Sequence, residues 1–164
     1  MKAWWPQIGP GQLGAANWLG VKQLVTESIS NYLRATFRAT MRHMPSIGSN
    51  FTPLERVVLT AICEKHLADR AALEAQLLTA SVLSRENTGA GFYTSFAVER
   101  ASSAAIGGER LRKGPAVRVD GLKHGMGFIL WLKEGYADEL EGYCYDESTT
   151  GIAFERVGFE ILQT

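Results

Sequence analysis

The densest run of hydrogen-bonding side chains in the sequence is Ser84-Arg85-Glu86-Asn87-Thr88. The Arg85 guanidinium could bind a carboxylate or a phosphate, with Asn87 and Thr88 fixing its orientation. Alternatively, Asn87 and Thr88 could hydrogen-bond their own turn backbone. Arg85 would then pair with Glu86 or another surface acid, and the residue types favour this structural role.

A second candidate is His124, which lies in a glycine-flanked loop just before a long apolar run. It could act as a general base if a carboxylate such as Asp120 or Glu141 oriented its ring. No nucleophile motif such as G-x-S-x-G accompanies it, so the sequence favours a solvated loop residue. A small-molecule site would require His124 and Arg85 to meet in one pocket between two glycine-rich loops.

A third candidate is a stretch of carboxylates and tyrosines near the C-terminus. Side chains alternate between the two faces of a strand, so Leu140, Gly142 and Cys144 would share one face. The opposite face would carry Glu139, Glu141, Tyr143 and Tyr145. Tyrosines supply contact area and carboxylates steer a basic partner, which suits protein binding. A solvated sheet face would show the same alternation, and the pattern leaves both interpretations open.

Motifs for phosphate or metal binding are not evident. Gly89-Ala90-Gly91 and Gly125-Met126-Gly127 do not extend to G-x-G-x-x-G, and no G-K-[ST] occurs, so these glycines are predicted to form turns. Cys63 and Cys144 lie far apart and outside any C-x-x-C or Cys/His array. We therefore expect no cofactor, no metal ion and two buried thiols in a reducing cytosol.

Two helices are predicted ahead of these candidate residues. Thr52-Pro53-Leu54-Glu55 is a capping box, and apolar residues at helical spacing extend the first helix to about His66. Asp69 is a candidate N-cap for a second helix that ends near Leu78. Beyond Leu78 the apolar period changes from helical to alternating, which indicates strands.

The predicted strands begin with a pair over 79–85 and 92–98, and further strands are expected over 115–122, 139–145 and 157–161. Met126 to Leu132 is a continuous apolar run, typical of a central strand. Residues 99–114 are predicted to be a polar connection. The sequence therefore predicts an α+β domain in which two N-terminal helices pack on a mostly antiparallel sheet of five or six strands.

Charge and composition define the expected domains. The 164 residues have a formal net charge of zero, but residues 1–50 hold five basic residues against one acidic residue. This asymmetry predicts an N-terminal extension over 1–50 and a single α+β domain over 51–164. The extension is predicted to contain a loosely attached, amphipathic basic helix over 17–42. A partner-binding helix, a targeting segment and an upstream start remain alternatives for it.

Several classes of protein are disfavoured by composition. Apolar residues make up 46% and charged residues 21%, so most of the chain should fold. The longest apolar run, Met126 to Leu132, is too short to cross a bilayer, and we expect a cytoplasmic protein without a membrane span. The basic stripe lies on the extension and the domain itself is acidic, which argues against nucleic-acid binding.

The segments Ser84–Tyr93, Gly121–Phe128 and Leu140–Tyr143 together resemble a set of small bacterial proteins that carry a domain of unknown function. The resemblance covers about residues 52–162 and implies a bacterial, cytosolic origin without an activity. Because no catalytic set is assembled, the leading hypothesis is a non-enzymatic protein-interaction module of immunity or accessory type that uses the acidic, tyrosine-bearing face. The alternative is a small-molecule binder or enzyme that uses Arg85 and His124.

Overall fold

The computed structural model describes residues 47–48 and 50–162. The chain divides into two units, residues 1–43 and 44–164, and all described residues belong to the second unit. The helix predicted over 17–42 therefore lies outside the described residues. Ile47 and Gly48, at the end of the predicted extension, pack on the domain: Ile47 is buried, and the Gly48 amide donates to the Leu77 carbonyl at 3.0 Å.

In the part of the chain that the structure describes, two α-helices come first, α2 over Pro53–Lys65 and α3 over Arg70–Leu78. The predicted capping box is confirmed, because the Glu55 amide donates to the Thr52 hydroxyl and the Thr52 amide donates to the Glu55 carboxylate. Asp69 precedes α3 but makes no side-chain cap, and its carboxylate instead accepts a hydrogen bond from the Arg112 guanidinium at 2.7 Å. Neither helix is long and apolar enough to cross a membrane.

Seven strands then form one sheet, with a short 3-10 helix, η1, over Arg100–Ser102. The strands are β1 Ser81–Asn87, β2 Gly91–Ala97, β3 Leu111–Lys113, β4 Val117–Val119, β5 Met126–Lys133, β6 Tyr136–Cys144 and β7 Phe159–Ile161. Their order is β1-β2-β6-β5-β4-β7, with β3 also paired to β5, and every pairing is antiparallel. The α+β class is confirmed, with seven strands rather than five or six.

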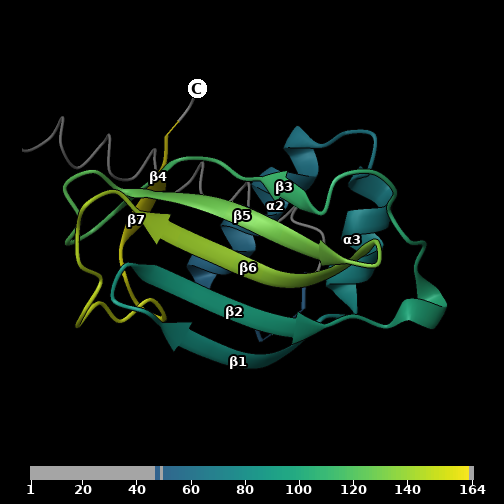
Figure 1. Ribbon diagram of the computed structural model, residues 1–164, viewed down its shortest axis with the longest axis horizontal. Coiled ribbons are helices and arrows are strands. Elements are labelled where there is room, and N and C mark those ends of the chain that lie inside the picture. The colour runs from purple at the N-terminus through teal and green to yellow at the C-terminus, as the bar shows by residue number, and fades with distance from the viewer. Residues whose placement is uncertain (1–46, 49, 163–164) are drawn as a thin grey trace, which may run out of the picture. The chain divides into compact units, whose positions relative to one another are not determined.

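Strand β5 lies inside the sheet, between β6 on one side and both β3 and β4 on the other (Figure 1). The prediction of a central strand over Met126 to Leu132 is confirmed. β5 and β6 are joined by Glu134 and Gly135, which both have positive φ angles of 56° and 83°. This is the backbone geometry of a two-residue hairpin turn of type I′, whose twist matches that of the flanking strands.

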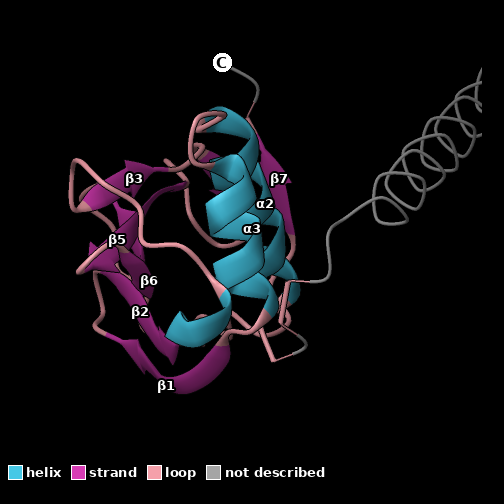
Figure 2. Ribbon diagram, turned by 90° about the vertical axis from the view of Figure 1, so that its right-hand side faces the viewer, coloured by secondary structure: helices cyan, strands magenta, loops and turns pink. Residues whose placement is uncertain are grey.

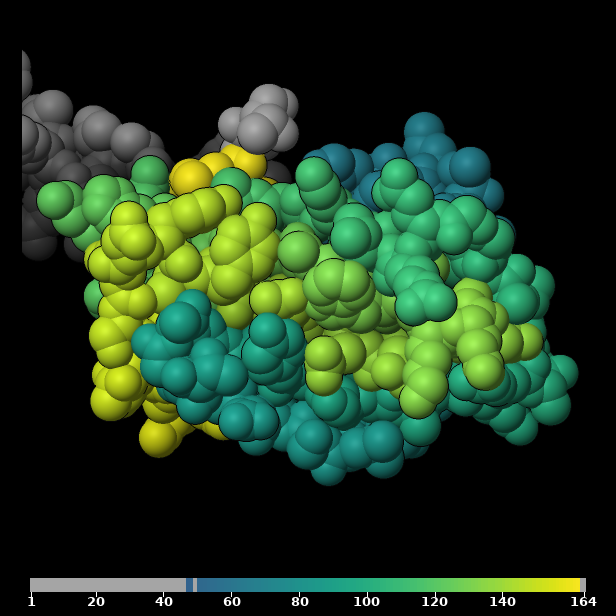
Figure 3. All heavy atoms as spheres, in the orientation of Figure 1, coloured from purple at the N-terminus to yellow at the C-terminus, as the bar shows by residue number. Residues whose placement is uncertain are grey.

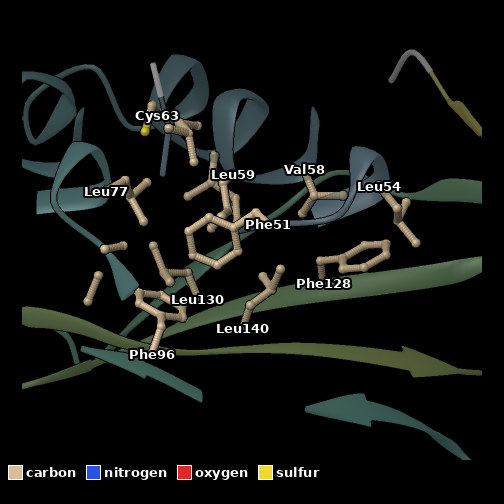
Figure 4. Packing of buried hydrophobic residues seen from close by; sticks show 14 of the residues in the cluster. Phe51, Leu54, Val58, Leu59, Cys63, Leu77, Phe96, Phe128, Leu130 and Leu140 are labelled. Atoms are coloured by element: carbon tan, nitrogen blue, oxygen red, sulfur yellow. The ribbon is translucent and has the colours of Figure 1, made fainter. Parts of the chain in front are cut away.

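Helices α2 and α3 cover one face of the sheet (Figure 2), and the hydrophobic core lies between the two layers. Phe51 packs edge-on against Phe96 of β2 with ring centroids 5.1 Å apart (Figure 4). Leu59 of α2 and Leu140 of β6 are completely buried in the same cluster. None of the described elements lies on the opposite face of the sheet, which we call the outward face.

Candidate binding face

Arg85 lies on β1 with its side chain on the helix side of the sheet, where it binds the buried carboxylate of Glu55. Its Nε donates to Oε1 and its Nη2 donates to Oε2, both at 2.9 Å. The Thr94 hydroxyl of β2 donates to Oε1 at 2.5 Å, and the Thr52 amide donates to Oε2 at 2.6 Å. The Arg85 Nη2 also donates to the Asn50 carbonyl at 2.6 Å. An internal carboxylate and a carbonyl therefore occupy the guanidinium.

Glu55 is only 2% exposed, so its ionisation depends on these hydrogen bonds. Burial alone would raise the pKa of the Glu55 carboxyl, but hydrogen bonds from Arg85, Thr94 and the Thr52 backbone outweigh burial and lower this pKa below its ordinary value. Glu55 thus remains an anion inside the domain and connects the start of α2 to strands β1 and β2.

Asn87 and Thr88 hold the β1–β2 turn. The Oδ1 of Asn87 accepts hydrogen bonds from the Gly89 amide at 3.0 Å and from the Thr149 hydroxyl at 2.7 Å. Its Nδ2 donates to the Thr149 carbonyl at 2.9 Å, and the Thr88 hydroxyl donates to the Gly91 carbonyl at 3.2 Å. Thr149 is completely buried, so the chain's own polar groups close this end of the sheet.

His124 lies in the β4–β5 connection with an exposed side chain. Its backbone amide and that of Lys123 donate to the two carboxylate oxygens of Glu147, at 2.7 and 2.8 Å. These backbone hydrogen bonds lower the pKa of Glu147. Strands β2, β6 and β5 lie between the strand of Arg85 and the connection of His124. The geometry therefore gives no support to a pocket shared by Arg85 and His124.

The outward face carries the acidic and aromatic side chains predicted on β6. The pairing register places Tyr93 of β2 opposite Glu141, and Ser95 opposite Glu139. On the other side of β6, Trp131 of β5 lies opposite Glu139. Figure 3 looks onto this face, where side chains of β1 and β2 (teal) and of β6 (yellow-green) are visible.

Glu141 is held between two aromatic side chains. The Tyr93 hydroxyl donates to Oε1 at 3.1 Å, and the Trp131 indole Nε1 donates to Oε2 at 2.8 Å. The Ser95 hydroxyl donates to the Glu139 carboxylate at 2.8 Å. The hydrogen bond to Glu141 raises the pKa of Tyr93, as expected for a phenol beside a carboxylate. Tyr93, Ser95 and Trp131 were not predicted as site residues.

Three carboxylates of the outward face, those of Glu86, Glu139 and Glu141, have no basic partner among the described residues. The ion pairs within the described part of the chain are Arg70–Glu74, Arg85–Glu55, Arg100–Glu134, Arg112–Asp69 and Arg118–Glu160. Lys113 of β3, opposite Ile129 in the register, and Lys133 of β5, two residues after Trp131, add two positive charges to the same face. The outward face therefore carries net negative charge.

Tyr143 and Tyr145 form an aromatic end to this face. Tyr143 lies across Gly127 of β5, because a Cβ atom on Gly127 would come within 2.4 Å of the Tyr143 ring. Tyr145 follows the end of β6 and packs edge-on against Tyr143 at 5.5 Å between ring centroids. The hydrogen bond with Tyr145 raises the pKa of Tyr143 to about 12. Gly127 thus leaves the space that the Tyr143 ring occupies.

A pocket of about 530 Å³ lies beside the β5–β6 turn, away from the predicted site residues. Its lining includes Arg110 and Lys133 as well as Glu109, Glu134 and Asp138, so both signs of charge are mixed. Within the described residues, no group of three or more histidine, cysteine or acidic side chains could hold a metal ion. The outward face is therefore the stronger candidate for binding.

The two cysteines differ in exposure, which predicts different reactivity. Cys63 is buried in α2, and burial together with the charge of Glu74 raises the pKa of its thiol to about 12. Cys144 is half-buried at the end of β6. We expect iodoacetamide at pH 8 to alkylate Cys144 in the native protein and to leave Cys63 unmodified, whereas both react in urea. Peptide mass spectrometry would show this, and equal native labelling would contradict it.

Comparisons of the chain with protein-family models, with curated proteins and with solved structures find no match. The fold and the candidate site define an α+β domain with one helix-covered sheet face and one acidic, aromatic face free of described elements.

Proposed function

We propose that this domain is a non-enzymatic protein-interaction module of accessory or immunity type, which holds a basic surface of another protein against the outward face. One observation carries the proposal: Glu139 and Glu141 are oriented by hydroxyl and indole donors, yet neither has a basic partner among the described residues. A basic partner surface would supply the missing positive charge.

The chemistry of the face suits protein contact. Half-buried Tyr93, Trp131 and Ile129 provide apolar and aromatic area, and aromatic residues are enriched where proteins bind each other. The carboxylates between them would steer a positively charged partner and fix its register. Strands β2, β6 and β5 provide a firm backbone below these side chains, so little order would have to be gained on binding.

Reversing the charge of Glu141 tests the proposal. Wild-type protein would be used to capture partners from the native host, and the affinity of the purified partner would then be measured by calorimetry. We expect Glu141→Arg to weaken that affinity at least about tenfold, because a positive charge would face the basic partner. Circular dichroism would confirm that the variant remains folded.

Glu64→Arg is the matched control, because Glu64 is exposed on α2 and the substitution makes the same charge change away from the outward face. We expect this variant to bind the partner as the wild type does. Equal affinity of wild type and Glu141→Arg, or equal weakening by both variants, would show that the outward face does not hold the partner.

A further inference from the structure

The Glu141 carboxylate has unused acceptor capacity on both of its oxygens. A carboxylate offers about four lone-pair sites, two on each oxygen. Tyr93 uses one site on Oε1 and Trp131 uses one on Oε2, so each oxygen retains one acceptor site. Both present donors are uncharged, and Glu141 forms no ion pair with any described residue.

We propose that Glu141 is an anchor for an arginine side chain of the partner, with the guanidinium bound to both carboxylate oxygens and in contact with the rings of Tyr93 and Trp131. This inference rests on the proposed function and names the chemistry that the outward face recognises. The ligand of this Glu141 anchor is an arginine-bearing segment of another protein.

Arginine fits this arrangement better than lysine for two physical reasons. A guanidinium is planar and donates two parallel N–H groups, which match the two oxygens of a carboxylate, whereas an ammonium is a single compact charge. A guanidinium is also more weakly hydrated than an ammonium and stacks on aromatic rings. It therefore loses less hydration free energy when it leaves water to bind beside Tyr93 and Trp131.

The anchor is already ordered before a ligand arrives. Tyr93 and Trp131 fix the Glu141 carboxylate from β2 and β5, the strands on either side of β6. Binding therefore does not have to order this side chain, which favours affinity. Glu139 lies two residues away on the same face, about 7 Å along the strand. An extended Arg-x-Arg segment presents two guanidinium groups at the same spacing.

The test uses the full chain labelled with ¹⁵N and two short peptides, acetyl-Arg-Ser-Arg-amide and acetyl-Lys-Ser-Lys-amide. The indole N–H resonance of Trp131, assigned with Trp131→Phe, reports on the anchor because this N–H donates to Glu141. We expect the arginine peptide to shift this resonance saturably and to bind at least about fivefold more tightly than the lysine peptide. We expect Glu141→Gln to weaken the arginine peptide about tenfold, and Glu64→Gln to leave it unchanged.

Equal binding of both peptides, or binding that survives Glu141→Gln, would overturn the arginine anchor. This failure is distinguishable from failure of the proposed function. If the natural partner is lost in Glu141→Arg but the peptides bind alike, the interaction module stands and the arginine anchor is wrong. If the natural partner binds Glu141→Arg as well as wild type, the outward face is not its binding surface and the arginine anchor of that partner fails with it.

Discussion

Replacing Arg85 by leucine is expected to lower the free energy of unfolding by about 3 kcal/mol, although Arg85 lies on an edge strand. The substitution removes two hydrogen bonds and the positive charge from a carboxylate that is only 2% exposed. A buried anion that has lost its charged partner is costly. Urea unfolding of wild type and variant at pH 7 would measure the difference.

The pH dependence of this difference has a defined sign. In the wild type the pKa of Glu55 is lowered from 4.5, so its contribution to stability is present above that value and is lost as the pH falls below it. In Arg85→Leu, burial becomes the dominant influence and should raise this pKa. The variant then gains stability as the pH falls from 7 towards 4.5, and the gap between wild type and variant should narrow.

Arg118→Leu is the control for an exposed ion pair, since the side chains of Arg118 and Glu160 are 63% and 65% exposed. It should change stability by no more than about 0.5 kcal/mol. Equal losses in Arg85→Leu and Arg118→Leu, or a gap between wild type and Arg85→Leu that does not change with pH, would contradict the role assigned to the Glu55 carboxylate.

Gly91→Ala is the second substitution with a large expected effect, a loss of at least about 3 kcal/mol of stability. A Cβ atom on Gly91 would lie 2.1 Å from the Gly142 carbonyl oxygen and 3.0 Å from the Tyr143 Cα. Both atoms belong to the backbone of β6, which is paired on both sides. The clash cannot be relieved by rotating a side chain, so β2 and β6 would have to separate locally.

Thermal unfolding with Gly107→Ala as control would check this expectation. A Cβ atom on Gly107 meets no atom within 4 Å, and Gly107 has no positive φ angle. The control should retain the wild-type melting temperature within about 2 °C, whereas Gly91→Ala should melt many degrees lower. A Gly91→Ala variant as stable as the control would mean that β2 and β6 are farther apart at Gly91 than these distances require.

Local signals in the sequence were the reliable ones. The capping box predicted the start of α2, and the apolar run predicted β5 as a central strand. Strand β3 was missed because its buried position is Arg112, so the segment reads as polar and shows no apolar alternation. Asp69 was expected to cap α3, but its partner Arg112 is distant in sequence, and no local pattern shows that contact.

In the candidate site, too, local patterns predict positions along one strand but not contacts between strands. Alternation along one strand placed Glu139, Glu141 and Tyr143 on a common face, which the register of β6 bears out. Tyr93 and Trp131 reach Glu141 from two other strands, and only strand order and register reveal this. Strand order also separates Arg85 from His124, although the residue types alone suggest them as partners.

The Glu55 carboxylate caps the start of α2 and also binds Arg85 of β1. The local opening of these two elements should therefore be a single event. If the first turn of α2 frays, the buried acid loses the Thr52 amide, and if β1 peels away, the acid loses Arg85. Either step exposes the same group to water and weakens the other contact. A helix start and a sheet edge usually open independently of each other. In this domain we expect the amide hydrogens of both to exchange together, as one cooperative unit.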